Sequence, residues 1–142
     1  MHPTDGDSII VSGNSDKITI RLVGIDAPET SKKKHKPDQP FSQKLTKYLA
    51  GLVLNKSVDV KSYGTDRYGR TLAVVFVDGK NVNLEMIKAG LAEVYRGPPA
   101  KGLELEPYWK AEKEAREAGR EMWSLGDKYV SPREWLKMQS DN

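Results

Sequence analysis

The sequence contains no cysteine and only two histidines, His2 and His35, among its 142 residues. The absence of cysteine excludes disulfide bonds, cysteine nucleophiles and thiolate metal sites. Two histidines argue against a histidine-based zinc site, because such sites usually draw on more imidazole ligands. Any metal ion is therefore expected to be held by oxygen atoms, which favours calcium or magnesium.

Long apolar runs are also missing. No stretch approaches the length that crosses a membrane, and no signal peptide is visible at Met1. We expect a secreted or cell-envelope protein whose targeting segment lies outside this sequence. A chain of this length can bury a core of its own, and residues 1–142 are expected to form one domain.

A strong charge imbalance is missing as well. Lysine and arginine number 23 against 20 aspartates and glutamates, which gives a net charge of +3 and a pI near 9.0. This mild basic bias gives weak support for a nucleic-acid partner. Four lysines gather in the polar segment 31–40, which is expected to be a mobile basic loop (Lys32, Lys33, Lys34 and Lys36). The plainer interpretation is a solvated loop, and the functional one is attraction of a polyanion.

The first part of the chain predicts a β-hairpin. Residues 8–11 are mostly apolar, residues 18–22 alternate between apolar and polar, and a turn-forming cluster over 13–16 separates them. If the turn centres between Asn14 and Ser15, the paired residue numbers sum to about 29. Asp7 then lies near Arg21 or Leu22, so a carboxylate meets an arginine.

The middle of the chain predicts a helix followed by strands. Apolar residues recur at helical spacing over 41–52, and β-branched residues predict strands near 58–60 and over 71–77. The last of these strands ends at Asp78-Gly79, a hairpin turn. Asn83 is then expected to cap a short helix through Lys88.

The C-terminal part, residues 103–142, is expected to be helical. One helix is predicted from Pro107 to about Ala118, and another after Ser131, where Glu134 completes a capping box. Three tryptophans of this part are interpreted as packing anchors rather than base-stacking platforms (Trp109, Trp123 and Trp135). Strands first, one inserted helix and helices at the end predict an α+β protein that is mainly β. The expected form is an OB-fold, a five-stranded barrel with about three helices.

Three short segments combine carboxylates with arginines. They are Asp5-Gly6-Asp7-Ser8, the run from Arg21 to Thr30 (RLVGIDAPET), and Thr65-Asp66-Arg67-Tyr68-Gly69-Arg70. Taken singly, each has a plain interpretation as a turn, a polar loop or a solvated charge. Together they offer oxygen ligands for a hard cation and two-pronged donors for a phosphate, which indicates phosphate chemistry.

These segments, in this order, resemble the thermonuclease family, the staphylococcal-nuclease-like OB-fold enzymes. The resemblance runs from about Asp5 to the C-terminal helices and includes Val82-Asn83, Gly90-Leu91-Ala92 and Trp123. Relatives have an apolar strand before the Asp-Gly-Asp motif. Only four residues precede Asp5 here, so either the sequence is trimmed at this end or the first strand is mostly missing.

The resemblance implies a role for each candidate residue. Asp7, Asp26 and the carbonyl of Ala27 would hold Ca²⁺, although many relatives have threonine in place of Ala27. Glu29 would activate the attacking water, and Arg21 and Arg70 would bind the scissile phosphate. Three further residues would contact the neighbouring substrate: Arg67 and Tyr68 a second phosphate, and Tyr95 a base.

The function expected from the resemblance is a Ca²⁺-dependent nuclease. It would cleave DNA, RNA or both, mainly single-stranded, and leave 3′-phosphate ends through contacts to the backbone. A monomer is expected. One alternative is a catalytically silent OB-fold module that only binds nucleic acid, and another is a metal-stabilised structural domain. The complete set of acids and arginines argues against the first alternative, and the arginines beside the acids argue against the second.

Overall fold

The structure is a computed structural model, and it describes the chain except for residues 1, 6, 14–15, 30–37 and 141–142. At residues 2–5 and 139–140 it describes the backbone alone. The predicted lysine cluster, Lys32 to Lys36, therefore lies outside the described residues. No helix in the described part of the chain is long and apolar enough to cross a membrane.

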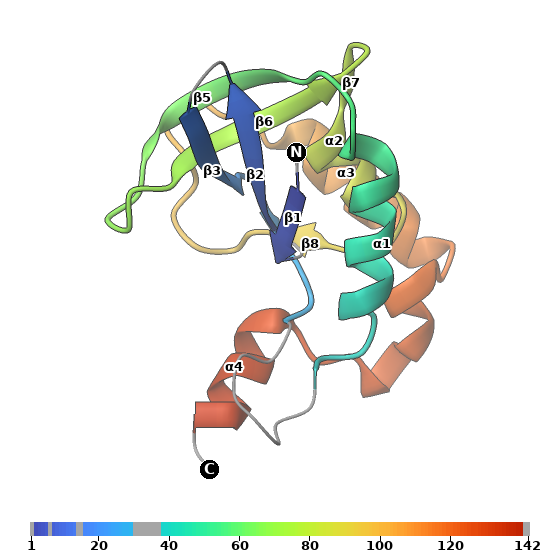
Figure 1. The fold of residues 1–142 in the computed structure, drawn as a ribbon. Helices are drawn as coiled ribbons and strands as arrows, with labels where there is room; N and C mark the ends of the chain where they lie inside the picture. The colour runs from blue at the N-terminus through green and yellow to red at the C-terminus, as the bar shows by residue number, and fades with distance from the viewer. Residues whose placement is uncertain (1, 6, 14–15, 30–37, 141–142) are drawn as a thin grey trace.

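Most of the strands form one twisted sheet (Figure 1). Its order is β1 (His2–Asp5), β2 (Ser8–Gly13), β3 (Asp16–Leu22), β6 (Thr71–Val77) and β5 (Asp59–Thr65), and β7 (Lys80–Asn81) pairs with β6. Neighbouring strands are antiparallel, except that β3 and β6 are parallel. Two short strands, β4 (Ile25–Asp26) and β8 (Glu93–Val94), pair separately.

The predicted hairpin register is confirmed. Ser8 pairs with Arg21 and Gly13 with Asp16. The backbone N–H of Leu22 donates to the carbonyl of Asp7 at 2.7 Å, so Asp7 lies beside the end of β3 as expected. Residues 2–5 form the short strand β1, which pairs with β2. Pro3 has no N–H to donate, which suits the edge position that β1 occupies.

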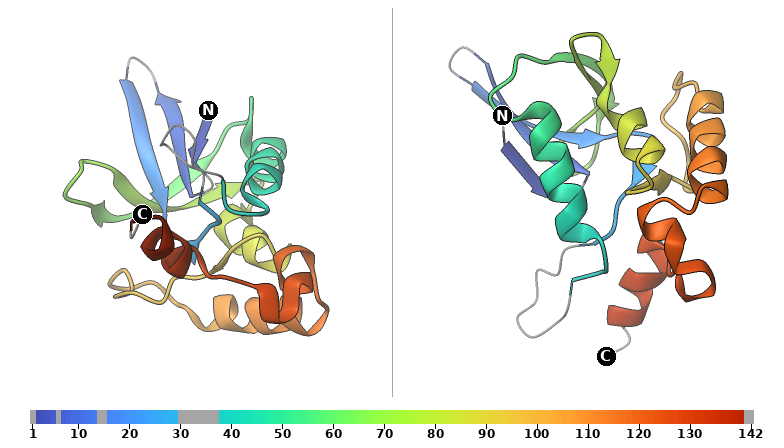
Figure 2. Two further views of the ribbon diagram at one scale, coloured as in Figure 1. Left: turned by 90° about the horizontal axis from the view of Figure 1, so that it is seen from below. Right: turned by 90° about the vertical axis from the view of Figure 1, so that its right-hand side faces the viewer.

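The helices gather on one side of the sheet and below it (Figure 2). They are α1 (Ser42–Val53), α2 (Val82–Lys88), α3 (Glu106–Glu117), the 3₁₀ helix η1 (Glu121–Lys128) and α4 (Pro132–Ser140). The first three stand side by side, with α2 between α1 and α3. Leu45, Leu49 and Val53 recur every four residues on α1 and are fully buried, which is the helical periodicity that the sequence predicted.

The mixed α+β class is confirmed, but the closed barrel is not. The path of paired strands begins at β1 and ends at β5, and these two strands do not pair with each other within the described residues. Four α-helices and one 3₁₀ helix are present there, rather than about three. Among these helices, η1 is the element that the sequence analysis did not predict, and Gly126 interrupts its helical geometry.

The predicted cap of α2 is wrong by two residues. The side chain of Asn81, rather than Asn83, accepts the hydrogen bond from the Leu84 N–H at 2.9 Å. Asn83 is fully buried, accepts from the Val75 N–H and donates to the carbonyls of Val23 and Ala73. A buried amide needs such partners, so Asn83 ties β6 to the turn after β3.

Two of the tryptophans pack in different surroundings. Trp123 is 9% exposed and packs in a small core cluster with Ala115 and Met122, as expected. Trp109 is 42% exposed, and the guanidinium carbon of Arg96 lies 5.3 Å from the centroid of its ring. Trp109 therefore packs against Arg96 at the surface rather than in the core.

Candidate active site

Six of the predicted site residues line one open cleft of ≈ 510 Å³: Asp7, Arg21, Asp26, Glu29, Arg70 and Tyr95. They come from the β1–β2 turn, the ends of β3 and β4, the segment after β4, the residue before β6, and the residue after β8. A second cavity of ≈ 360 Å³ shares Arg21, Arg70 and Tyr95 and adds Arg67 and Tyr68. Ala27 is only 2% exposed, so its side chain does not face the cleft.

Arg21 is held by oxygen atoms on two sides. Its guanidinium donates to the carbonyls of Leu22 and Ile25, which brace it against the turn between β3 and β4. On the other side it lies 3.4 Å from a carboxylate oxygen of Asp7, and both side chains are 17% exposed. Because these contacts fix the plane of the guanidinium, its remaining N–H groups have a defined direction toward the cleft.

Asp26 lines the cleft near both acids and arginines. Burial, together with the negative charges of Asp7 and Glu93, raises the pKa of Asp26 to about 6, and the positive charges of Arg21 and Arg133 oppose this shift. A cation bound between Asp7 and Asp26 would favour the charged form of Asp26.

The residues present therefore fit a hard cation. Asp7 and Asp26 supply carboxylate oxygens, and the backbone carbonyl of Ala27 is next to Asp26 in the chain. Among the described residues there is no group of three or more acidic, histidine or cysteine side chains that could hold a metal. A site with few protein ligands leaves coordination positions for water and substrate oxygens.

Glu29 lies in the segment between β4 and α1, and its backbone is hydrogen-bonded to Gln39. Its N–H donates to the Gln39 side-chain oxygen at 3.0 Å, and its carbonyl accepts from the Gln39 N–H at 2.8 Å. Its partly exposed side chain lines the cleft.

The loop between β5 and β6 is organised by Asp66. One carboxylate oxygen of Asp66 accepts from the N–H groups of Tyr68 and Arg70, both at 2.9 Å, and the other accepts from the Arg70 guanidinium at 2.7 Å. Although loss of solvent acts to raise it, these bonds and the Arg70 charge lower the pKa of Asp66. Gly69 has φ of +79°, a left-handed conformation that most side chains disfavour.

The same loop carries two cations next to one ring. The Arg67 guanidinium lies 5.0 Å and that of Arg70 5.8 Å from the centroid of Tyr68, which is 69% exposed. Arg70 also donates to the Ser8 hydroxyl at 3.4 Å, and Ser8 donates to Asp7 at 3.4 Å. These contacts link the loop to the carboxylate end of the cleft.

Tyr95 closes the opposite side. Its ring centroid is 5.9 Å from the Arg21 guanidinium, and its N–H donates to the carbonyl of Gly24 at 3.0 Å. A Cβ at Gly97 would come within 2.2 Å of the Tyr95 hydroxyl, so only glycine there allows the ring to take this position. The ring thus lies at the border of the two cavities.

Sequence reasoning missed three contributors to the cleft. Arg133 and Leu136 reach it from α4, which the capping box at Ser131 predicted as a helix without indicating where it packs. Asp66 was part of a recognised segment, but its role in holding Arg70 was not foreseen. An aspartate at the first position of a turn, three residues before a glycine, is a signal that could have revealed it.

We expect Asp26→Asn to make the metal-free protein more stable at pH 7. Burial raises the folded pKa of Asp26 from 3.8 to about 6, so the folded state binds the proton more tightly than the unfolded state. Ionisation of Asp26 therefore lowers the free energy of unfolding. This loss is absent at pH values below the pKa of Asp26 in the unfolded state, and it is complete above its pKa in the folded state. At about 1.4 kcal/mol per pKa unit, the variant gains at most about 3 kcal/mol.

Urea unfolding with chelator at pH 7 and pH 4 measures this effect, and the gain should shrink at the lower pH. Asp59→Asn is the matched control, because Asp59 is exposed on β5. A loss of stability in Asp26→Asn at pH 7 would contradict the expected cost of the buried charge.

Similar proteins share one activity in their names. The chain is 37% identical over 142 residues to "Uncharacterized endonuclease" of Haemophilus influenzae, covering 98% of this chain and 72% of that protein. It is 39% identical over 125 residues to another "Uncharacterized endonuclease", from Escherichia coli O157:H7, covering 87% and 74%. It is 40% identical over 134 residues to "Probable endonuclease LCL3" of Coccidioides posadasii, covering 83% of this chain but 42% of that protein.

The chain thus spans under half the length of that fungal relative and about three quarters of the two bacterial ones. A family model described as "Staphylococcal nuclease homologue" matches residues 19–125. This range includes Arg21, Arg70 and the segment from Asp26 to Glu29. The chain therefore belongs to the staphylococcal nuclease family, as the sequence resemblance indicated.

Proposed function

We propose that this protein is a Ca²⁺-dependent nuclease that hydrolyses phosphodiester bonds of DNA, RNA or both and leaves 3′-phosphate ends. The observation that carries the proposal is the single cleft lined by Asp7, Arg21, Asp26, Glu29 and Arg70. Membership of the family and the endonuclease names of similar proteins support it. The OB barrel of the family, a monomeric state and a secreted or cell-envelope location are part of the same proposal.

Asp7, Asp26 and the Ala27 carbonyl would hold the metal. When bound, Ca²⁺ supplies positive charge that polarises a phosphate oxygen and neutralises part of the charge of the transition state. Calcium suits this donor set better than magnesium, because it accepts irregular coordination by few protein oxygens.

The residues of the chain supply the remaining steps. Glu29 takes a proton from the attacking water, whose oxygen bonds to phosphorus as the bond to the 5′-oxygen breaks. Arg21 and Arg70 donate hydrogen bonds to the non-bridging phosphate oxygens, where charge builds up. Both are already held by acceptors, Arg21 by backbone carbonyls and Arg70 by Asp66, so little reorganisation is needed.

The second cavity suits the neighbouring part of a single strand. Arg67 and Tyr68 can contact a phosphate, while Tyr95 offers a ring face on which a base stacks without sequence preference. Contacts of this kind act on the backbone and on the flat face common to all bases. The proposed substrate is therefore a single-stranded nucleic acid of any sequence.

A cleavage assay tests the proposal. Purified protein is incubated with single-stranded DNA and RNA in Ca²⁺, in Mg²⁺ and in chelator, and the product ends are identified. We expect cleavage in Ca²⁺, poor cleavage in Mg²⁺, none in chelator, and recovery when Ca²⁺ is restored. Full activity in chelator would overturn the metal assignment. Binding without cleavage under all conditions would instead indicate the silent nucleic-acid-binding module.

We expect binding to weaken steeply with salt. Each phosphate contact contributes about −0.7 to the slope of log affinity against log salt on a single strand. Affinity for a fluorescent oligonucleotide is measured from low to high salt in a Glu29→Gln background, which limits cleavage. Replacing Arg67 with alanine should make the slope shallower by about 0.7. Arg120→Ala, which lies outside both cavities, should not change the slope, and a flat response in the parent would contradict backbone-driven binding.

A further inference from the structure

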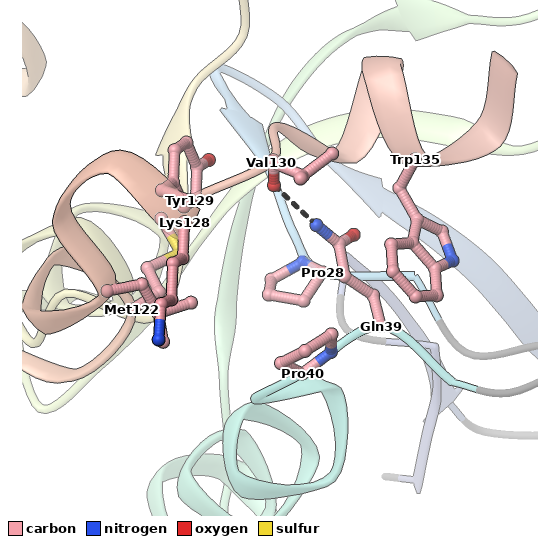
Figure 3. Close-up of a pocket in the computed structure, with 9 residues that line it drawn as sticks. Pro28, Gln39, Pro40, Met122, Lys128, Tyr129, Val130 and Trp135 are labelled. Carbon is pink, nitrogen blue, oxygen red and sulfur yellow. Dashed lines mark hydrogen bonds between the residues drawn. The ribbon is translucent and has the colours of Figure 1, made fainter. Parts of the chain in front are cut away.

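Gln39 is a buried amide between the Glu29 segment and the C-terminal helices. Its exposed fraction is 5%, although it lies in a connecting segment just before α1. Figure 3 shows its side chain with Pro28 and Pro40 on one side and Trp135 on the other, and with the amide nitrogen pointing toward the carbonyl of Val130. Val130 belongs to the short link between η1 and α4.

Both polar atoms of the Gln39 side chain form hydrogen bonds. The side-chain oxygen accepts from the Glu29 N–H at 3.0 Å, and the side-chain nitrogen donates to the Val130 carbonyl at 2.7 Å. The Gln39 N–H adds a bond to the Glu29 carbonyl at 2.8 Å. The peptide groups on both sides of the Glu29 Cα are therefore held by this one residue, which is also joined to a segment 91 positions away.

Apolar side chains do not fill all of the space where the Gln39 segment meets the C-terminal helices. A small cavity of ≈ 70 Å³ remains there, lined among others by Pro28, Pro40, Met122, Tyr129 and Trp135. Beside this cavity, the hydrogen bonds of Gln39 connect the Glu29 backbone to the carbonyl of Val130.

The backbone next to Gln39 supports a constrained arrangement. Phe41 has φ of +73°, a left-handed conformation that is uncommon for a side chain of this size. Pro40 and Gln39 precede Phe41 in the chain. The carbonyl of Phe41 accepts a hydrogen bond from the N–H of Leu45 in the first turn of α1. Such a conformation persists when surrounding contacts hold it. At Phe41 it changes the direction of the chain between Gln39 and the start of α1.

The opposite end of the connection also reaches the cleft. Val130 is followed within three residues by Arg133, which lines the cleft with Glu29. One amide thus links the segment that carries the candidate base to the segment that carries a cleft arginine.

We propose that Gln39 is a positioning residue, which fixes the backbone of Glu29 and joins it to the C-terminal segment. This inference rests on the proposed function, since Glu29 is the base of that reaction. Gln39 does not touch the substrate. Its effect is to keep the Glu29 carboxylate at the place where it meets the attacking water, and small displacements of such a group have large effects on rate.

The test replaces Gln39 with methionine, which has nearly the same length and cannot form either amide bond. Gln43→Met is the matched control, because Gln43 lies four residues further on and its amide donates to Asp38 at an exposed position. Each variant is measured alone and combined with Glu29→Gln, and kcat and KM are determined separately. If Gln39→Met does not fold, the same measurements are made on Gln39→Asn. Its side chain is one methylene shorter and cannot reach both partners.

We expect Gln39→Met to lower kcat about 10- to 100-fold, the range typical for a displaced reacting group, with little change in KM. In the Glu29→Gln background the same replacement should cause little further loss, because its effect passes through Glu29. Gln43→Met should match the parent. Equal losses from Gln39→Met with and without Glu29→Gln would overturn the proposal and assign Gln39 a structural role only.

Amide hydrogen exchange gives a readout that does not need activity. The Glu29 N–H should exchange faster in Gln39→Met, whereas the Leu45 N–H, which bonds to the Phe41 carbonyl, should keep its protection. Unchanged protection of Glu29 overturns the positioning role even if the proposed nuclease function holds. If the parent cleaves and Glu29→Gln cleaves equally well, the assignment of the base fails instead, and exchange still reports whether Gln39 holds this backbone.

Discussion

Replacing Glu29 with glutamine is expected to lower kcat by about 10²–10⁴, the usual contribution of a general base. The amide keeps the size of the side chain and cannot take a proton from water. Folding should be preserved, because the backbone of Glu29, rather than its carboxylate, makes the bonds to Gln39. Initial rates on single-stranded DNA with saturating Ca²⁺ measure the effect, and circular dichroism establishes that the variant is folded.

Glu104→Gln is the matched control, since Glu104 is an exposed acid in the turn before α3 and outside the cleft. It removes the same charge and should retain the parental rate. A folded Glu29→Gln variant with the parental kcat would show that another group handles the attacking water.

Replacing Arg70 with lysine is expected to lower kcat about 10²–10³-fold, as for the loss of a transition-state hydrogen-bond donor, or roughly 3–4 kcal/mol. Lysine keeps the charge but cannot make the planar, two-pronged contact to phosphate. It also loses the orientation that Asp66 gives to the guanidinium. Arg21→Lys should cause a similar loss of rate.

The two arginines should differ in their effect on stability. Arg21 donates to the carbonyls of Leu22 and Ile25 and is mostly buried, so Arg21→Lys should also lower the unfolding temperature. Arg70 is held in a more exposed loop, and its replacement should cost less. Arg120→Lys, an exposed arginine whose guanidinium bonds to a backbone carbonyl, controls for the substitution itself. Parental kcat in both folded variants would contradict the assignment of these arginines to the scissile phosphate.

The strands and helices were largely predictable because their patterns are local. The β2–β3 register follows from alternation over 18–22 and a turn at 13–16, and the structure reproduces it. The helix over 41–52 and the hairpin at Asp78-Gly79 also agree with the prediction. Asn83 was misassigned because a cap and a buried tertiary hydrogen-bonding residue look alike in sequence, and only the packing of α2 on β6 distinguishes them.

The sequence predicted most of the residues that line the cleft, but it did not predict how they are held there. The acids and arginines were found from their short segments, and five of those residues line one cleft, together with Tyr95. Their roles stay predictions. The orientation of Arg70 by Asp66 was not foreseen, although both residues lie in the same loop. Arg133 was also missed, since the place where α4 packs is not encoded in its own nine residues.

By itself the sequence determined the hairpin that brings Asp7 to Arg21 and the family to which the chain belongs. These depend on residue type and on spacing over a few positions, where backbone geometry leaves few alternatives. Only the tertiary structure decided the raised pKa of Asp26, the bridge from Gln39 to Val130 and the approach of Arg133 to the cleft. Each of these depends on burial or on contact between segments far apart in the chain, which the packing of η1 and α4 against the rest of the molecule establishes.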